Sequence, residues 1–159
     1  MDVVNDQDEV IGQASKKEVY EKLLTHRIAE VFVFNDAGEL LLQKRSANCS
    51  YCPLHWSMSA AGHVDTGETY EQAIHREMQE EIGVDLPLTF VGKEYYTEDP
   101  RNVMKFIAVF QATSNGPFNV NPQEVDSVAF FPLDRVREMI KNGEPFHPQM
   151  KYMLARYFK

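Results

Sequence analysis

Apolar residues occur in short blocks along the chain, and polar segments that contain glycine, proline or asparagine separate them. The block Val31-Phe32-Val33-Phe34 is continuous and rich in β-branched and aromatic side chains. It predicts a strand over residues 28–34 that is buried on both faces. A turn at residues 35–38 and the run Leu40-Leu41-Leu42 predict a strand that returns beside it. The same criteria predict a hairpin over residues 1–14 and strands at residues 88–96, 103–112 and 127–131.

Two stretches carry a pattern that starts helices, a serine or threonine followed three residues later by glutamate or glutamine. Ser15 with Glu18 forms the first pair, and Thr69 with Gln72 forms the second. Gly83 suits the left-handed end of the helix that the second pair starts. Towards the C-terminus, apolar residues recur at the spacing of a buried helix face. The expected helices span residues 15–24, 70–82, 133–141 and 148–158.

Strands with helices between and after them predict an α+β protein, an α/β/α sandwich around a mixed β-sheet. The length of 159 residues fits one domain over residues 1–159, with enough chain to bury a hydrophobic core. The composition, with 43% hydrophobic and 25% charged residues, is that of an ordinary folded protein.

The net charge of −8 argues against a nucleic-acid polymer or an anionic membrane as partner, because both favour a basic surface. A small anionic substrate remains compatible with this charge, since bound cations can reverse the local field. The first 15 residues are acidic and lack the apolar core of a signal peptide, and two cysteines cannot form a disulfide framework. We therefore expect a cytoplasmic protein. The sequence leaves open whether it is a monomer or a homodimer.

The candidate chemistry lies in residues 62–84. Gly62 is followed after five residues by Glu68, and after seven more by the run Arg76-Glu77-Met78-Gln79-Glu80-Glu81-Ile82-Gly83-Val84. On a helix the three glutamates of this run fall within an arc of about 100°. Carboxylates brought together in this way repel one another unless a cation such as Mg²⁺ binds between them. The alternative is an acidic helix face that is simply exposed to solvent. Such a face would not require glycine at positions 62 and 83.

Every position of this segment matches the signature of the Nudix hydrolases, which the chain resembles. That family cleaves nucleoside diphosphates linked to another moiety, so the resemblance implies a Nudix fold and attack of water on phosphorus with Mg²⁺, or Mn²⁺ as a substitute. It implies that Glu68 orients the helix through Arg76, and that Glu77 is a possible base. The metal ligands it implies are Glu77, Glu80, Glu81 and the backbone carbonyl of Ala61.

Many Nudix proteins recruit one more carboxylate from outside this motif. Glu124, which precedes the last predicted strand, is the first candidate for a further metal ligand, and an exposed loop carboxylate is the equally weighted alternative. The other candidates are Glu94, Glu98 and Asp99.

The substrate is expected to be a small-molecule diphosphate whose attached group the sequence does not identify. Lys44 and Arg45 follow an apolar strand and could clamp phosphate oxygens, although such pairs are often solvated. Trp56 could stack on a base, although buried aromatic residues are more common than stacking platforms. The loops at residues 46–56, 97–102 and 115–123 are expected to bind the group beyond the diphosphate.

The chain also resembles isopentenyl-diphosphate isomerase, which shares the Nudix fold, at residues 24–27, 61–63 and 124–133. Its proton-transfer chemistry needs a cysteine before the Gly-His pair and a glutamate on a later strand. Ala61 and Lys105 occupy those places here, and alanine cannot transfer a proton. An isomerase-like enzyme remains one alternative to hydrolysis, although these two substitutions oppose it. A non-catalytic diphosphate-binding module is the other alternative, and it is opposed by the fact that no motif carboxylate is lost.

Cys49 and Cys52 form a C-x-x-C pair, a spacing found in redox dithiols and zinc sites. His55 and His63 lie nearby in the sequence, but not at the spacing of a zinc finger. Pro53 and the long surrounding loop differ from the helix start that a redox dithiol usually occupies. We therefore expect Cys49 and Cys52 to be ordinary thiols. We also expect structural rather than catalytic roles for His26 and His63.

Overall fold

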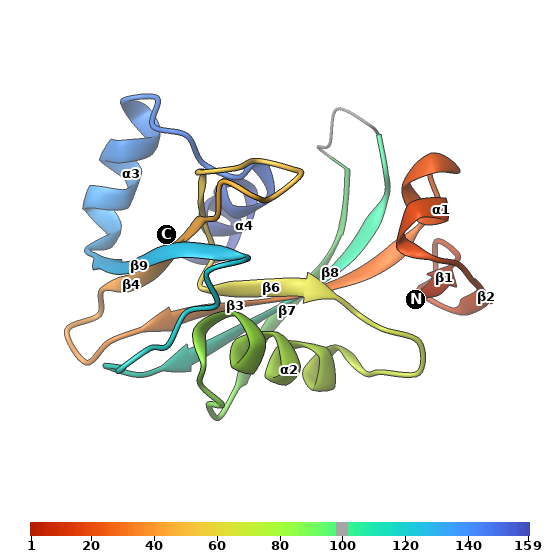
Figure 1. Cartoon of the computed structure of the whole chain (residues 1–159), viewed down its shortest axis with the longest axis horizontal. Coiled ribbons are helices and arrows are strands. Elements are labelled where there is room, and N and C mark those ends of the chain that lie inside the picture. Colours follow the sequence, from red (N-terminus) through yellow and green to blue (C-terminus); the bar gives the residue numbers. More distant parts are fainter. Residues whose placement is uncertain (98–101) are drawn as a thin grey trace.

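The computed structural model describes residues 1–97 and 102–159. Its strands and helices form three layers around a mixed sheet (Figure 1). The strands are β1 (Asp2–Val4), β2 (Val10–Gln13), β3 (His26–Phe34), β4 (Leu40–Arg45), β5 (Trp56–Ser57), β6 (Ala60–His63), β7 (Thr89–Tyr96), β8 (Lys105–Thr113) and β9 (Val125–Phe131). The helices are α1 (Lys16–Glu21), α2 (Tyr70–Ile82), α3 (Leu133–Lys141) and α4 (Pro148–Tyr157).

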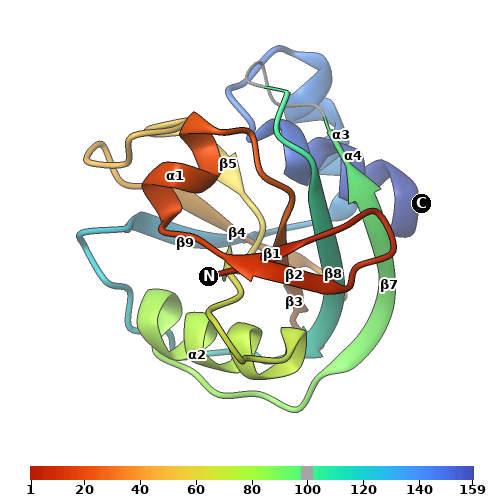
Figure 2. The same ribbon diagram turned by 90° about the vertical axis from the view of Figure 1, so that its right-hand side faces the viewer.

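The main sheet has the strand order β5-β4-β3-β8-β7, with β6 also paired to β3 and β9 to β4. Strands β3 and β8 are parallel, with His26 opposite Lys105 and Phe34 opposite Thr113, and the other paired strands are antiparallel. Strands β1 and β2 form a separate hairpin, which lies with α1 on the side of the molecule that faces the viewer in Figure 2.

Each face of the sheet buries its own apolar layer. Along β3, Ala29 and Val31 pack towards α2, whereas Ile28 and Phe32 pack towards α3 and α4. This alternation explains why residues 31–33 are all fully buried. The predicted α/β/α sandwich around a mixed sheet is confirmed. None of the helices in the described part of the chain has the length and apolar character needed to span a bilayer.

Helix α2 is fixed at both ends and along one side. The Thr69 side chain accepts from the Gln72 amide, and the Gln72 side chain accepts from the Thr69 amide, as the sequence predicts. Gly83 ends the helix with φ of 69°, a conformation that glycine adopts without steric cost. Ile74, Met78 and Ile82 are fully buried against the sheet. The direction of the neighbouring glutamates is therefore set by core packing.

Several boundaries differ from the sequence predictions. Helix α1 ends at Glu21 rather than at residue 24, because Leu23 has a positive φ of 54° and turns the chain. Strand β9 begins at Val125 rather than at residue 127, since Val125 still pairs with Arg45. Strands β5 and β6 were not predicted at all. They are two and four residues long and lack β-branched residues, so pairing with longer neighbours defines them.

Candidate active site

Three carboxylates converge where α2 meets the segment before β9. Glu77, Glu81 and Glu124 each offer one oxygen, and these oxygens lie within 4.8 Å of one another. Glu77 and Glu81 are one turn apart on α2 and are buried, with 8% and 5% of their surface exposed, whereas Glu124 is exposed. Carboxylates at this separation can share one divalent cation.

The sheet holds Glu81 in place. The Gln43 side chain on β4 donates to Glu81 Oε2 at 2.7 Å, and the backbone amide of Ala61 on β6 donates to the same oxygen at 3.3 Å. Gln43 also donates to the carbonyl of Ser59 at 3.2 Å, which fixes its amide. Sequence reasoning did not identify Gln43, because one glutamine in an apolar strand carries no pattern that marks a site.

Glu77 lies directly against the backbone of β6. A Cβ atom added to Gly62 would stand 1.9 Å from Glu77 Oε1 and 2.0 Å from its carboxyl carbon. Only glycine therefore permits this approach. Gly62 lies in strand β6, opposite Ala29 of β3.

Arg76 forms hydrogen bonds to several acidic residues of the motif. Its Nε and one terminal nitrogen donate to the two oxygens of Glu68, both at 2.9 Å, so the expected Arg76–Glu68 contact is present. It also donates to Glu77 at 2.7 Å, to Glu80 at 3.4 Å and to the carbonyl of His63 at 2.9 Å. These contacts occupy the guanidinium within the protein, which supports an orienting role.

The environment of the buried carboxylates opposes their ionisation. Burial raises the pKa of Glu77 to about 7, with smaller contributions from Glu80 and Glu124, while Arg76 acts in the opposite direction. Burial and then Glu77 raise the pKa of Glu81 to about 8, although Gln43 and Ala61 lower it. The folded chain thus brings several carboxylates together and buries two of them, an arrangement that a cation stabilises.

Arg76→Ala is expected to weaken Mn²⁺ binding at least about tenfold, because Glu77 loses the hydrogen bond that orients its carboxylate. Removal of a positive charge alone would strengthen cation binding, so weaker binding indicates lost orientation. Arg76→Lys is the matched control, since it keeps the charge but cannot bridge both oxygens of Glu68. Titration of Mn²⁺ without substrate measures the effect. Unchanged Mn²⁺ affinity with a raised KM would instead place Arg76 on the substrate.

Not every predicted residue joins the carboxylate group. The Glu80 side chain is 51% exposed, pairs with Arg76 and lies outside the group formed by Glu77, Glu81 and Glu124. Ala61 lines the adjoining cavity. Glu94 accepts hydrogen bonds from Arg156 and Tyr157 and does not line the cavity. The candidates Glu98 and Asp99 lie outside the described residues.

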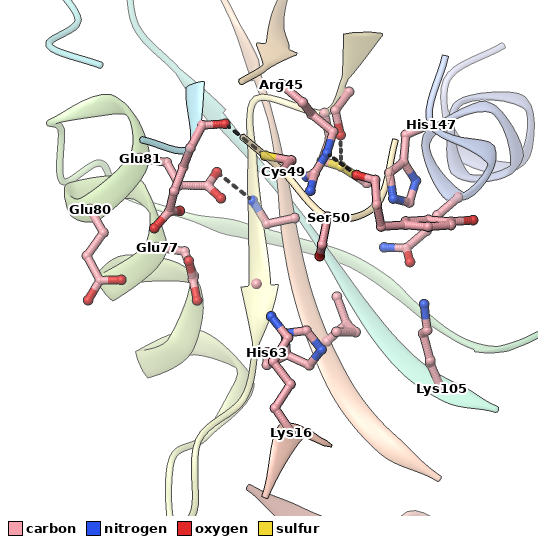
Figure 3. A pocket seen from close by; sticks show the side chains of 18 of the residues that line it. Lys16, Arg45, Cys49, Ser50, His63, Glu77, Glu80, Glu81, Lys105 and His147 are labelled. Carbon is pink, nitrogen blue, oxygen red and sulfur yellow. Dashed lines mark hydrogen bonds between the residues drawn. The ribbon is translucent and has the colours of Figure 1, made fainter. Parts of the chain in front are cut away.

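A cavity of about 660 Å³ opens from the carboxylates along β6 (Figure 3). The loop at residues 46–56 supplies part of its wall, through Asn48, Cys49, Ser50 and Tyr51. Arg45 lines this cavity and donates to the carbonyl of Tyr51 at 3.1 Å. Helix α1 and strand β8 complete the wall with Lys16, Tyr20 and Lys105, none of which was assigned a binding role from the sequence.

Lys44 and Trp56 do not line this cavity, although the sequence made both of them substrate-binding candidates. Successive strand residues point to opposite faces, so Lys44 points away from the cavity that Arg45 faces. The Lys44 ammonium lies 5.7 Å from the Trp56 ring, and Trp56 packs edge-to-face on Phe131 at 5.4 Å. Of these three residues, only Arg45 keeps a place in the candidate site.

His63 is part of an aromatic group at the far end of the cavity. Its Nε2 lies 2.8 Å from the Tyr20 hydroxyl, and its ring stacks on His26 at 5.3 Å. Burial lowers the pKa of His63 to about 2, and electrostatic interactions with Lys16, His26 and Lys105 act in the same direction. His63 is therefore neutral over the whole physiological range, which agrees with a structural role.

Cys49 and Cys52 are not joined in a disulfide. Cys49 lines the cavity, and its thiol donates to the backbone carbonyl of Glu124 at 3.4 Å. The carboxylate trio is the only cluster with metal-ligating geometry among residues 1–97 and 102–159, so a zinc site that includes the cysteines is not formed there. Cys49 instead helps to position the loop that carries Glu124.

Glu30 lies in the middle of β3 and is fully buried. The Gln149 side chain donates to Glu30 Oε2 at 2.7 Å, whereas Oε1 has no hydrogen-bond partner. Burial raises the pKa of Glu30 to about 8, against the smaller opposing effects of Gln149 and Lys105. Folding therefore favours the protonated acid, and ionisation of Glu30 destabilises the folded protein.

Glu30→Gln is expected to stabilise the protein at high pH relative to wild type. The pKa of Glu30 is about 8 in the folded protein and about 4.5 in the unfolded chain. The folded wild type therefore loses stability as pH rises from about 4.5 to about 8. The variant carries no such group, so its advantage in unfolding free energy should grow by at least about 2 kcal/mol between pH 5 and pH 9. Denaturant unfolding at both pH values measures this, with the exposed Glu71→Gln as control. A pH-independent difference would contradict it.

Comparison with known proteins places the chain in a family of hydrolases. The NUDIX domain family matches residues 24–155 of the chain. An uncharacterized Nudix hydrolase from Nostoc is 33% identical over 163 aligned positions, which cover 99% of this chain and 95% of the relative. A Photorhabdus laumondii protein named isopentenyl-diphosphate Delta-isomerase 2 is 34% identical, over 89% of this chain and 81% of its own.

Solved structures show the same fold. The crystal structure of DR0079 from Deinococcus radiodurans superposes with a TM-score of 0.87 at 25% identity, over 99% of this chain and 98% of that chain. The Nudix domain of Shewanella oneidensis NrtR, solved with ADP ribose, has a TM-score of 0.67 at 17% identity over 89% and 96% of the chains, and supports the fold alone. The chain belongs to the Nudix family and is a Nudix hydrolase. Such proteins act on nucleoside diphosphate derivatives and typically use a divalent metal.

Proposed function

We propose that this protein hydrolyses the diphosphate linkage of a nucleoside diphosphate derivative, with Mg²⁺ as cofactor and water as the nucleophile. The convergence of Glu77, Glu81 and Glu124 is the observation that carries the proposal. Two of these carboxylates are buried, and their pKa values are raised in the absence of a cation. A set of carboxylate oxygens beside an open cavity suits Mg²⁺, which prefers carboxylates together with substrate phosphates.

Within this proposal, Glu77, Glu81 and Glu124 hold the cation, with the Ala61 carbonyl as a further ligand. Glu80 is the family ligand that lies outside the trio, and its exposed side chain on α2 is one turn from Glu77. The bound cation would supply positive charge that stabilises the diphosphate oxygens as negative charge develops on them.

The proposal also assigns roles in substrate binding, positioning and proton transfer. Arg45 lines the cavity and is placed to contact the diphosphate, where a guanidinium can bind two oxygens at once. Arg76 and Glu68 hold the carboxylate face of α2 in register with β6. Glu77, which lies against Gly62 at the cavity wall, is our candidate to accept a proton from the attacking water.

A panel of nucleoside diphosphate derivatives, incubated with Mg²⁺ or Mn²⁺ and scored for phosphate and nucleotide release, tests this function. The panel should include nucleoside di- and triphosphates, nucleotide sugars and dinucleotides. Hydrolysis of at least one class is expected, together with loss of turnover in EDTA after metal stripping. Full turnover in EDTA would contradict the metal-dependent mechanism, and binding without turnover of any compound would favour a non-catalytic module.

The isomerase alternative is motivated by the Photorhabdus laumondii relative, whose name assigns that activity to that protein. Here Ala61 lines the cavity beside the carboxylates and offers only a methyl group. Proton transfer to an alkene needs an acid within reach of it, and alanine cannot supply one. Isopentenyl diphosphate with Mg²⁺ should therefore give no dimethylallyl diphosphate above the no-enzyme control. Detection of that product would overturn the hydrolase proposal in favour of isomerisation.

A further inference from the structure

The cavity has two ends of opposite charge. Glu77, Glu80 and Glu81 of α2 lie at one end, and Lys16 and Lys105 lie at the other, with His63 at the end of strand β6 between the two groups (Figure 3). In the proposed function, the carboxylates at the acidic end would hold the cation, and the cation would bind the diphosphate. Lys16 and Lys105 lie apart from the three glutamates in Figure 3 and have no role in the proposed hydrolysis.

Lys16 differs from the neighbouring lysines in and just after helix α1. Lys17 pairs with Glu21 at 3.7 Å and Lys22 pairs with Glu18 at 3.1 Å. Lys16 makes no ion pair with any residue that the structure describes, and it is exposed and lines the cavity. A lysine at a cavity wall keeps its charge available to a ligand when no carboxylate nearby neutralises it.

Lys105 supplies the second charge. It is only 6% exposed, begins strand β8 and lines the same cavity. Glu30, which acts on Lys105 electrostatically, does not itself line the cavity. Lys16 and Lys105 are both near enough to influence the His63 ring. Two ammonium groups thus flank one neutral histidine in a protein whose net charge is −8.

We propose that Lys16 and Lys105 form a second anion-binding subsite, which selects diphosphate substrates that carry another anionic group away from the diphosphate. This inference rests on the proposed function. Ammonium groups at a partly desolvated wall bind anionic oxygens through charge-assisted hydrogen bonds. A neutral sugar or base would place no anionic oxygen beside these two lysines. The second group is a phosphate monoester or a carboxylate, since both present anionic oxygens.

Matched substrates that differ only in the second anion test the subsite. UDP-glucuronate and UDP-glucose differ by a carboxylate, and ADP-ribose 2′-phosphate and ADP-ribose differ by a phosphate. We expect kcat/KM to be at least about tenfold higher for the anionic member of at least one pair, the scale of one hydrogen bond between charged groups. The pair that shows the preference identifies the anion as a carboxylate or a phosphate.

Lys16→Met should lower this preference at least about fivefold, mainly by raising KM for the anionic substrate. Lys17→Met is the matched control on the same helix, because Lys17 is paired with Glu21 and does not line the cavity. Lys105→Met tests the buried charge, and its circular dichroism and melting temperature show whether it folds. Because Lys16 is exposed, its variant decides the question if Lys105→Met does not fold.

The two proposals fail in different ways. Absence of hydrolysis across the whole panel contradicts the proposed function, and calorimetric Kd values for the same pairs, with Ca²⁺ replacing Mg²⁺, then decide the subsite separately. A ratio near one in both pairs overturns the subsite while the hydrolase stands. A preference that Lys16→Met and a folded Lys105→Met leave unchanged overturns it as well, because the selectivity then arises elsewhere in the cavity.

Discussion

Gly62→Ala is expected to lower kcat by about 100-fold or more while the protein stays folded. The new methyl group would stand 1.9 Å from Glu77 Oε1, closer than any non-bonded contact allows. The obstructed atom belongs to the far end of a flexible side chain, so the carboxylate can rotate away without movement of α2. A displacement of about 1 Å at a catalytic group costs on the order of 100-fold in rate.

Steady-state kinetics on the best substrate of the panel, with Mn²⁺ titration and thermal melting, measures the effect of Gly62→Ala. The melting temperature should change little while Mn²⁺ affinity falls. Gly12→Ala is the matched control, since a Cβ atom there meets nothing within 4 Å. If Gly62→Ala retained wild-type activity and metal affinity, Glu77 could not be held against β6 during the reaction.

Glu81→Gln is also expected to reduce kcat by about 100-fold or more, the cost of removing one electrostatic stabiliser from a reacting centre. The substitution keeps the shape and the contact with Gln43 but removes the charge that would bind the cation. The loss should not arise from unfolding. Burial raises the pKa of Glu81 to about 8, so the metal-free wild type loses stability as pH rises from about 4.5 to about 8, and the neutral variant does not.

Kinetics at pH 8 combined with denaturant unfolding of the metal-free protein separates these effects of Glu81→Gln. We expect lower activity with equal or higher stability. Glu71→Gln serves as control, because Glu71 is exposed in the first turn of the same helix. A folded Glu81→Gln variant within threefold of wild-type kcat would remove Glu81 from the proposed metal site.

The sequence predicts the main elements of the fold because their signals are local. The capping box of Thr69 and Gln72 and the left-handed Gly83 delimit α2 without reference to any other segment. Strand β6 has no such signal, since its residues 60–63 combine small side chains with a histidine. It is a strand because β3 pairs with it, with Glu30 opposite Ala61. Pairing between distant segments decides such short strands.

In the candidate site as well, local signals predict some residues, whereas contacts between distant segments determine others. The motif spacing places Glu77 and Glu81 on one helix face, and burial of Ile74 and Met78 fixes that face. Partners from other elements could not be predicted: Gln43 reaches Glu81 from β4, and Lys16 reaches the cavity from α1. Such convergence depends on strand order and on the path of α1, for which the sequence alone contains no direct signal. The sequence makes Glu124 a candidate ligand because it is a carboxylate next to a predicted strand.

The segment at residues 119–124 is tied to the end of α2 by backbone hydrogen bonds. The amide of Asn119 donates to the Ile82 carbonyl, and the amide of Asn121 donates to the Glu81 carbonyl, both at 3.0 Å. The amide of Glu124 donates in turn to the Asn121 carbonyl at 3.0 Å. A cation held by Glu81 and Glu124 would therefore cross-link this segment to the helix and oppose its local opening. Deuterium uptake at the Asn121 amide should slow when Mg²⁺ is added, which makes one backbone proton a reporter of metal occupancy even without a substrate.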